Sequence, residues 1–257
     1  MPNYHPECLD KAFFAMRADP KCIPFAGGLS FAGVENQHYL YLESIPELDK
    51  AHNREDCIGT GIGAMMTLDE LMEIKSVPMV LRRAAASVPT DIRKKATVGG
   101  AVCSLDKRSD ILPVLAALSA SVIVRTRVTE KVVTLAEFYK GSKVNLPDGS
   151  LVTAVIVPYD SFTNASFEKS TTKESGQKVS VTGLAKTMDG IVNEMRIAIG
   201  GVTDVPVVVG VEKIGVVGVP CAQIKQQGNA YARKVCELAA VYDDSAIRLT
   251  EGFFAKL

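Results

Sequence analysis

The order of helix and strand patterns changes near Pro158, and this change constrains the fold more than any other feature of the chain. Before Pro158, patterns typical of helices alternate with patterns typical of strands. After it, three strand-like segments follow one another: 167–169, 179–188 and 191–199. Asp189-Gly190 is a hairpin turn signal between the last two, and the pattern is helical from about residue 221. We therefore predict an α+β protein with a domain boundary near residue 160.

Local signals place several elements in the first part of the chain. The apolar spacing from Leu9 to Met16 predicts a helix, and Thr67 with Glu70 forms a capping box that opens another. Ser109 is the predicted N-cap of a helix over 110–118. The other predicted elements are a helix over 78–86 and strands over 22–25, 39–42, 57–64, 128–134 and 151–157. Residues 89–106 are predicted to form a loop.

The charge balance and the cysteine spacing exclude several classes of protein. Lys plus Arg and Asp plus Glu each number 29, and the longest basic run, Arg93-Lys94-Lys95, is interpreted as a solvated loop. We therefore expect no nucleic-acid partner. No two of the six cysteines lie within four residues of each other, so we predict no zinc or iron–sulfur site. No apolar run reaches the ~18 residues of a membrane span, and the polar segment from Met1 to Asp10 does not resemble a signal peptide, so we expect a cytosolic protein.

Of three glycine clusters, the one over Gly59–Gly63 most resembles a nucleotide-binding motif, and we interpret it otherwise. A dinucleotide fingerprint has the spacing Gly-x-Gly-x-x-Gly and an acidic residue ~20 positions later. Here the third glycine comes one place early, and no acidic residue occurs over 80–83. We expect strand glycines packed against a neighbouring backbone. A Gly-Lys-Ser/Thr phosphate loop is also missing from the sequence.

The other two clusters have chemistry that suits an anionic diphosphate. The first is Ala26-Gly27-Gly28-Leu29-Ser30, directly after a predicted strand, and the second is Thr97-Val98-Gly99-Gly100. Consecutive glycines can leave successive amide N–H groups in a concave nest that binds anions. A plain tight turn is the alternative reading of each cluster taken alone.

Several motifs in the same order and spacing resemble one family. They are 62–71, 91–93, 96–100, 109–113, 135–141, 167–169 and 196–202. With these motifs the chain resembles the flavin-binding medium subunit of the xanthine dehydrogenase family of molybdenum hydroxylases. The resemblance spans nearly the whole chain and is strongest over 58–125.

This resemblance implies an α+β fold and a cofactor. Residues 1–160 would form a two-lobed flavin-binding domain of the vanillyl-alcohol oxidase and p-cresol methylhydroxylase type, with lobes of about 1–53 and 54–160. Residues 161–257 would form a small C-terminal domain of antiparallel strands and helices. FAD would lie extended between the two lobes.

The resemblance also implies roles for individual residues. The first loop (Ala26, Gly27, Gly28, Leu29 and Ser30) and the second (Thr97, Gly99 and Gly100) would hold the pyrophosphate from two sides. Ser104 and Asp110 would bind the phosphate and ribose region. Phe31 and Val152 would lie near the ring system, and Lys169 would approach the flavin face, although an exposed surface lysine is the alternative for that residue.

By the same resemblance, the chain would act as one subunit of a larger oxidoreductase and carry no catalytic residue of its own. A small subunit with two [2Fe–2S] clusters would deliver electrons from a large molybdopterin subunit to FAD, and NAD⁺ or another acceptor would take them. Two residues depart from the family pattern: Leu29 replaces a small polar residue or histidine, and Ala101 replaces an asparagine. A flavin-free scaffold subunit and a free-standing flavoenzyme of the same fold are the alternatives.

Overall fold

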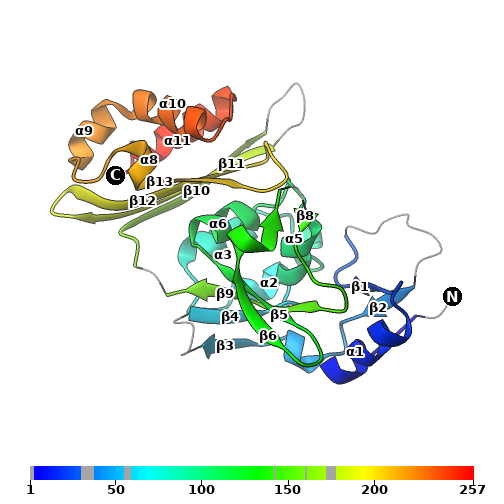
Figure 1. Ribbon diagram of the computed structural model, residues 1–257. Helices are drawn as coiled ribbons and strands as arrows, with labels where there is room; N and C mark the ends of the chain where they lie inside the picture. The colour runs from blue at the N-terminus through cyan, green and yellow to red at the C-terminus, as the bar shows by residue number, and fades with distance from the viewer. Residues whose placement is uncertain (1–2, 30–37, 55–58, 142, 160, 172–177) are drawn as a thin grey trace. The chain divides into compact units, whose positions relative to one another are not determined.

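The computed structural model describes residues 3–29, 38–54, 59–141, 143–159, 161–171 and 178–257 (Figure 1). The chain divides into two compact units. The N-terminal unit comprises Met1–Pro78, Ala85–Leu105 and Ser119–Tyr159. The C-terminal unit comprises Met79–Ala84, Asp106–Leu118 and Asp160–Leu257, so it includes two short segments from the earlier part of the chain.

A five-stranded antiparallel sheet forms the centre of the N-terminal unit. In spatial order its strands are β3 (Ala51–Arg54), β4 (Gly59–Gly63), β9 (Leu151–Pro158), β5 (Ser121–Arg125) and β6 (Glu130–Thr134). The middle strand, β9, is apolar and buried along almost its whole length, as expected of a strand covered on both faces. The outer strand β6 is mostly exposed.

Short elements surround this sheet. They are β1 (Ile23–Phe25), β2 (Tyr39–Tyr41), β7 (Tyr139–Lys140), β8 (Lys143–Val144), α1 (Leu9–Ala18), α2 (Leu68–Leu71), α4 (Thr90–Arg93), α5 (Val98–Ser104), α7 (Leu135–Phe138) and the 3₁₀ turn η1 (Pro46–Leu48). β1 and β2 pair in parallel, and the apolar face of α1 packs beside them with Leu9 and Phe13 in one core with Leu40. Helix α3 (Met79–Ala86) carries residues of both units.

The C-terminal unit is an antiparallel sheet with helices on both faces. Its strands in spatial order are β10 (Asn164–Thr171), β11 (Lys178–Met188), β12 (Ile191–Gly200) and β13 (Val207–Gly210). Helices α8 (Val211–Ile214), α9 (Cys221–Gln226), α10 (Gly228–Leu238) and α11 (Asp244–Phe254) follow them. Figure 1 shows α9, α10 and α11 together over one face, and Phe253 and Phe254 of α11 belong to the core they share with the sheet. Helix α6 (Ile111–Ala117) contacts β11 and β12.

The predicted mixture of helices and strands is confirmed, and so are its main local signals. Thr67 and Glu70 form a reciprocal capping box at the start of α2. Asp189 and Gly190 both have positive φ (52° and 74°) in the turn between β11 and β12, as a type I′ hairpin turn requires. The interpretation of Gly59–Gly63 as strand glycines is confirmed, because a Cβ on Gly63 would lie 2.3 Å from the Leu48 carbonyl oxygen.

Two local predictions are wrong. The predicted loop over 89–106 contains helices α4 and α5, because Thr97 caps α5 and its first turn is held by backbone bonds to residues far away in sequence. Asp110, rather than Ser109, is the N-cap residue of α6, and its side chain makes no capping bond because ion pairs hold the carboxylate.

Within the described residues, no helix has both the length and the apolar character needed to cross a membrane.

Candidate functional site

The first glycine cluster forms a turn that follows β1 directly. Gly27 packs so closely on Lys95 that a Cβ atom would lie 1.6 Å from the Lys95 carbonyl oxygen, so only glycine fits there. Gly28 has a φ of +74°, and the ring of Phe25 lies beside it. Leu29 is 47% exposed.

The backbone of this turn offers a run of hydrogen-bond donors. No atom of the described residues accepts a hydrogen bond from the N–H groups of Gly27, Gly28 or Leu29. The turn is also half-buried over Ala26–Gly28. Successive amides without protein acceptors, in a turn with a positive φ, are the arrangement that binds phosphate groups in proteins. Ser30 and Phe31, which were predicted to extend this site, lie outside the described residues.

The second glycine cluster is built differently from the prediction. The N–H of Gly99 donates to the Ala64 carbonyl oxygen at 2.8 Å, and the N–H of Gly100 donates to Thr97 Oγ1 at 3.1 Å. The N–H of Val98 donates to the Met66 carbonyl oxygen at 2.9 Å. The expectation of an open amide nest here is therefore wrong, because protein oxygens already accept these bonds. Gly99 is instead needed for close packing, since a Cβ would lie 2.6 Å from that of Ala64.

The fold brings the two clusters together. A Cβ atom placed on Gly100 would lie 3.9 Å from the Cβ of Ala26, and Gly27 touches the backbone just before Thr97. The turn over Ala26–Leu29 therefore lies against the beginning of α5. Thr97 is buried and caps the helix.

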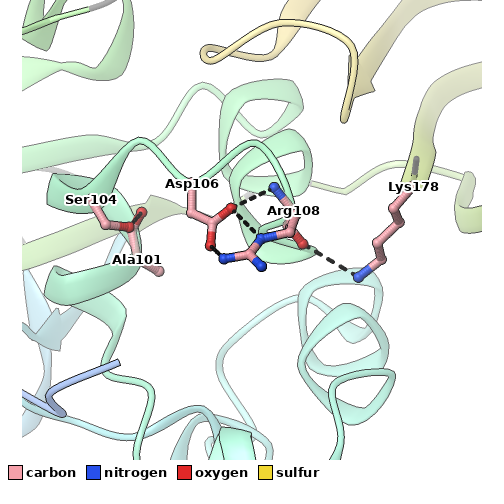
Figure 2. A network of polar contacts seen from close by, with 5 residues as sticks. All are labelled: Ala101, Ser104, Asp106, Arg108 and Lys178. Atoms are coloured by element: carbon pink, nitrogen blue, oxygen red, sulfur yellow. Dashed lines mark hydrogen bonds and ion pairs between the residues drawn. The ribbon is translucent and has the colours of Figure 1, made fainter. Parts of the chain in front are cut away.

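Ser104 and Val152 lie in α5 and β9, two elements that contact each other. Ser104 is the last residue of α5, about 10 Å along the helix from Thr97, and its hydroxyl donates to the Ala101 carbonyl oxygen at 3.4 Å (Figure 2). Val152 lies in β9 and is 6% exposed. It pairs with Val124 next to a shift in register between β5 and β9.

Asp110 and Lys169, the two remaining predicted residues, meet in the C-terminal unit. The Asp110 carboxylate is buried, and the Lys169 ammonium lies 3.0 Å from one of its oxygens. Lys178 forms an ion pair with the other oxygen and also donates to the Arg108 carbonyl oxygen at 3.3 Å (Figure 2). Lys169 is therefore an ion-paired residue that fixes β10 to the start of α6.

Lys178 is the residue that the sequence reasoning missed. It begins β11 and lies on the same face of the sheet as Lys169, because Lys178 is paired with Thr171 and Lys169 with Ser180. The period-two alternation of polar Lys178 and Ser180 with apolar neighbours was the available signal. Nearby, Arg108 pairs with Asp106 through two of its nitrogens and lowers the pKa of that carboxyl (Figure 2).

The sequence comparison identifies the family. Residues 2–160 match the family described as the FAD binding domain in molybdopterin dehydrogenase. The chain belongs to this family. Its cofactor is FAD and its members are oxidoreductase subunits, as the resemblance predicted.

Among the described residues, no group of three or more His, Cys, Asp or Glu side chains could hold a metal ion.

Two relatives are similar to large parts of the chain. A glyceraldehyde dehydrogenase medium chain of Sulfolobus acidocaldarius is 25% identical over 210 residues, which are 78% of this chain and 75% of that protein. The uncharacterized protein YgfM of Escherichia coli K12 is 31% identical over 143 residues, which are 55% of this chain and 50% of that protein.

Solved structures share the fold along the whole chain. A chain of quinoline 2-oxidoreductase from Pseudomonas putida 86 superposes with a TM-score of 0.85 at 18% identity, covering 100% of this chain and 96% of that one. A chain of carbon monoxide dehydrogenase from Hydrogenophaga pseudoflava superposes with a TM-score of 0.83 at 19% identity, covering 100% of this chain and 95% of that one. At these identities, the likeness concerns the fold alone.

Proposed function

We propose that this chain binds FAD with the diphosphate on the Ala26–Leu29 turn, and that it relays electrons within a larger molybdenum hydroxylase. The run of three amide donors at Gly27, Gly28 and Leu29, which have no acceptor among the residues that the structure describes, is the observation that carries the proposal. A diphosphate satisfies such donors with its oxygens, and the two glycines allow the close packing on Lys95 and the positive φ that this turn requires.

The other residues implied by the family resemblance complete the proposed site. Thr97, Gly99 and Gly100 would support the turn and border the pyrophosphate, since their own amides are engaged within the protein. Ser104 and Asp110 would bind the phosphate and ribose region. Ser30, Phe31, Val152 and Lys169 keep the roles that the resemblance gives them, near the phosphate or the ring system.

In this proposal, the cofactor carries out the redox chemistry and the residues of this chain position the cofactor. When bound, FAD would supply both one-electron and two-electron redox chemistry. The chain's residues would hold the diphosphate, orient the cofactor and exclude water from it. We propose that its partners are an iron–sulfur small subunit and a molybdopterin large subunit. The electron acceptor would be NAD⁺ or another molecule, and the location would be the cytoplasm. The name "medium chain" of the Sulfolobus relative supports an assembly of this kind.

The first test is a visible absorption spectrum of the purified full-length chain, recorded before and after FAD is added and the protein is desalted. Flavin retained at about one per chain supports the proposed site. A protein that stays colourless, both alone and with co-expressed partner subunits, would contradict it and favour the flavin-free scaffold.

A pair of substitutions at Ala26 tests where the diphosphate binds. Ala26→Asp and Ala26→Asn introduce side chains of almost equal size, and only the first carries a negative charge. Because the charge would lie beside the diphosphate, Ala26→Asp should raise the Kd for FAD by about tenfold or more over Ala26→Asn. Equal Kd values for the two variants, measured by titration of flavin fluorescence, would show that the diphosphate binds elsewhere.

A further inference from the structure

The main chain of Lys95 lies against the first glycine turn. A Cβ atom on Gly27 would lie only 1.6 Å from the Lys95 carbonyl oxygen. This oxygen therefore fills the space that a side chain at Gly27 would need. Standard bond lengths then put the two Cα atoms within about 6 Å of each other. A lysine side chain has a flexible four-carbon stem of similar length, so the first glycine turn lies within the range of the Lys95 ammonium.

The three consecutive cations over 93–95 differ in their surroundings. Arg93 is engaged, because its Nε donates to an Asp69 carboxylate oxygen at 2.6 Å. Lys94 and Lys95 are exposed, and neither forms an ion pair with any residue that the structure describes. The run is largely solvated, as its interpretation as a solvated loop expected, but it begins at the last residue of helix α4.

We propose that Lys95 is a further binding residue for the diphosphate of FAD, acting as a point charge beside the amide donors of the first glycine turn. This inference rests on the proposed function. The turn contributes only backbone dipoles and neutral side chains, so a diphosphate there leaves negative charge that one nearby ammonium group offsets. Lys95 is suited to this role because its backbone touches the turn and its ammonium has no carboxylate partner in the described structure.

The strength of such an interaction depends on salt. An exposed ammonium within a few ångströms of a phosphate attracts it appreciably at low ionic strength, and the attraction is screened over about 10 Å at 0.1 M salt. The effect of Lys95 on the Kd for FAD should therefore be largest at low salt. A role of Lys95 in folding alone would show no such dependence.

The test compares the Kd for FAD of the full-length wild type with those of Lys95→Met, Lys95→Arg and Lys94→Met, at about 20 mM and about 300 mM KCl. Lys95→Met should raise the Kd about three- to tenfold at low salt and less at high salt, and Lys95→Arg should stay within about twofold of the wild type. Lys94→Met is the matched control, with the same charge change one residue away, and should have less than half of the effect.

Each outcome separates this inference from the proposed function. Wild-type protein that does not bind FAD at all contradicts the proposed function itself. Wild-type protein that binds FAD, with Lys95→Met and Lys94→Met equally weakened or both unchanged, overturns only the role of Lys95. Equal thermal unfolding midpoints of the three variants will show that their folds are comparable.

Discussion

The ammonium group of Lys169 lies 3.0 Å from a carboxylate oxygen of Asp110, which is 2% exposed. The two residues are 59 positions apart in sequence, and the ion pair fixes strand β10 to the beginning of helix α6 within the C-terminal unit. Lys178 holds the second oxygen of the same carboxylate. One buried acid is thus shared by two lysines from neighbouring strands.

Removal of the Asp110 charge should destabilise the protein. Asp110→Asn leaves two ammonium groups without their carboxylate, and because both lysines can turn toward water, we expect a loss of about 1–3 kcal/mol in the free energy of unfolding. Urea denaturation measures this loss. Glu7→Gln, which breaks the exposed pair with Lys11, is the control and should cause no measurable change. A loss for Asp110→Asn as small as for the control would contradict the assignment.

Two glycines of the C-terminal unit should respond in opposite ways to alanine. A Cβ on Gly183 would lie 2.3 Å from the ring of Phe253, so Gly183→Ala should destabilise the protein by about 1–3 kcal/mol through overpacking. Gly252 lies in α11 with no atom near its Cβ position, so Gly252→Ala should stabilise it by about 0.5–1 kcal/mol. Thermal unfolding midpoints that move in the same direction for both variants would refute this reading of the packing.

Acid should weaken the contact between α1 and the start of β2 through Asp19. The hydrogen bond from His38 lowers the pKa of the Asp19 carboxyl below its ordinary value of 3.8. A carboxyl with a lowered pKa stabilises the folded protein above its ordinary pKa, and the contribution is lost as the pH falls through the lowered value. The urea midpoint of wild type should therefore fall more steeply than that of Asp19→Asn between about pH 5 and about pH 3, where an aspartate carboxyl titrates. Parallel slopes would exclude this role of Asp19.

The hydroxyl of Tyr139 should stabilise the folded protein in neutral solution, and less so in alkaline solution. It donates to the Val102 carbonyl oxygen of α5 at 2.9 Å, and Tyr139→Phe leaves this acceptor unpaired at a cost of about 1 kcal/mol. Burial raises the pKa of Tyr139 far above its ordinary value of 10.0. The folded state then favours the neutral phenol, so its stability falls as the pH rises above the ordinary value. Urea midpoints of wild type and Tyr139→Phe should converge in alkali; a constant difference would argue against the raised pKa.

The sequence alone predicted the features that depend on neighbours along the chain. The Thr67–Glu70 capping box and the Asp189-Gly190 turn are formed by residues at most three positions apart, so their chemistry can be read directly. The consecutive strands of the antiparallel sheet after Pro158 could likewise be predicted from the alternation within each strand. The motifs that resemble the flavin-binding family were also sufficient to identify it.

Only the tertiary structure decided which glycine cluster keeps its amides open. Both clusters have the residues of an anion nest, yet the carbonyl oxygens of Ala64 and Met66 accept the bonds of the second and turn it into a helix start. The tertiary structure likewise put Lys178 on Asp110 and the Lys95 backbone against Gly27. These contacts join residues dozens of positions apart. Spacing along the chain carries no signal for them, because they arise only when packing of the apolar core brings distant segments together.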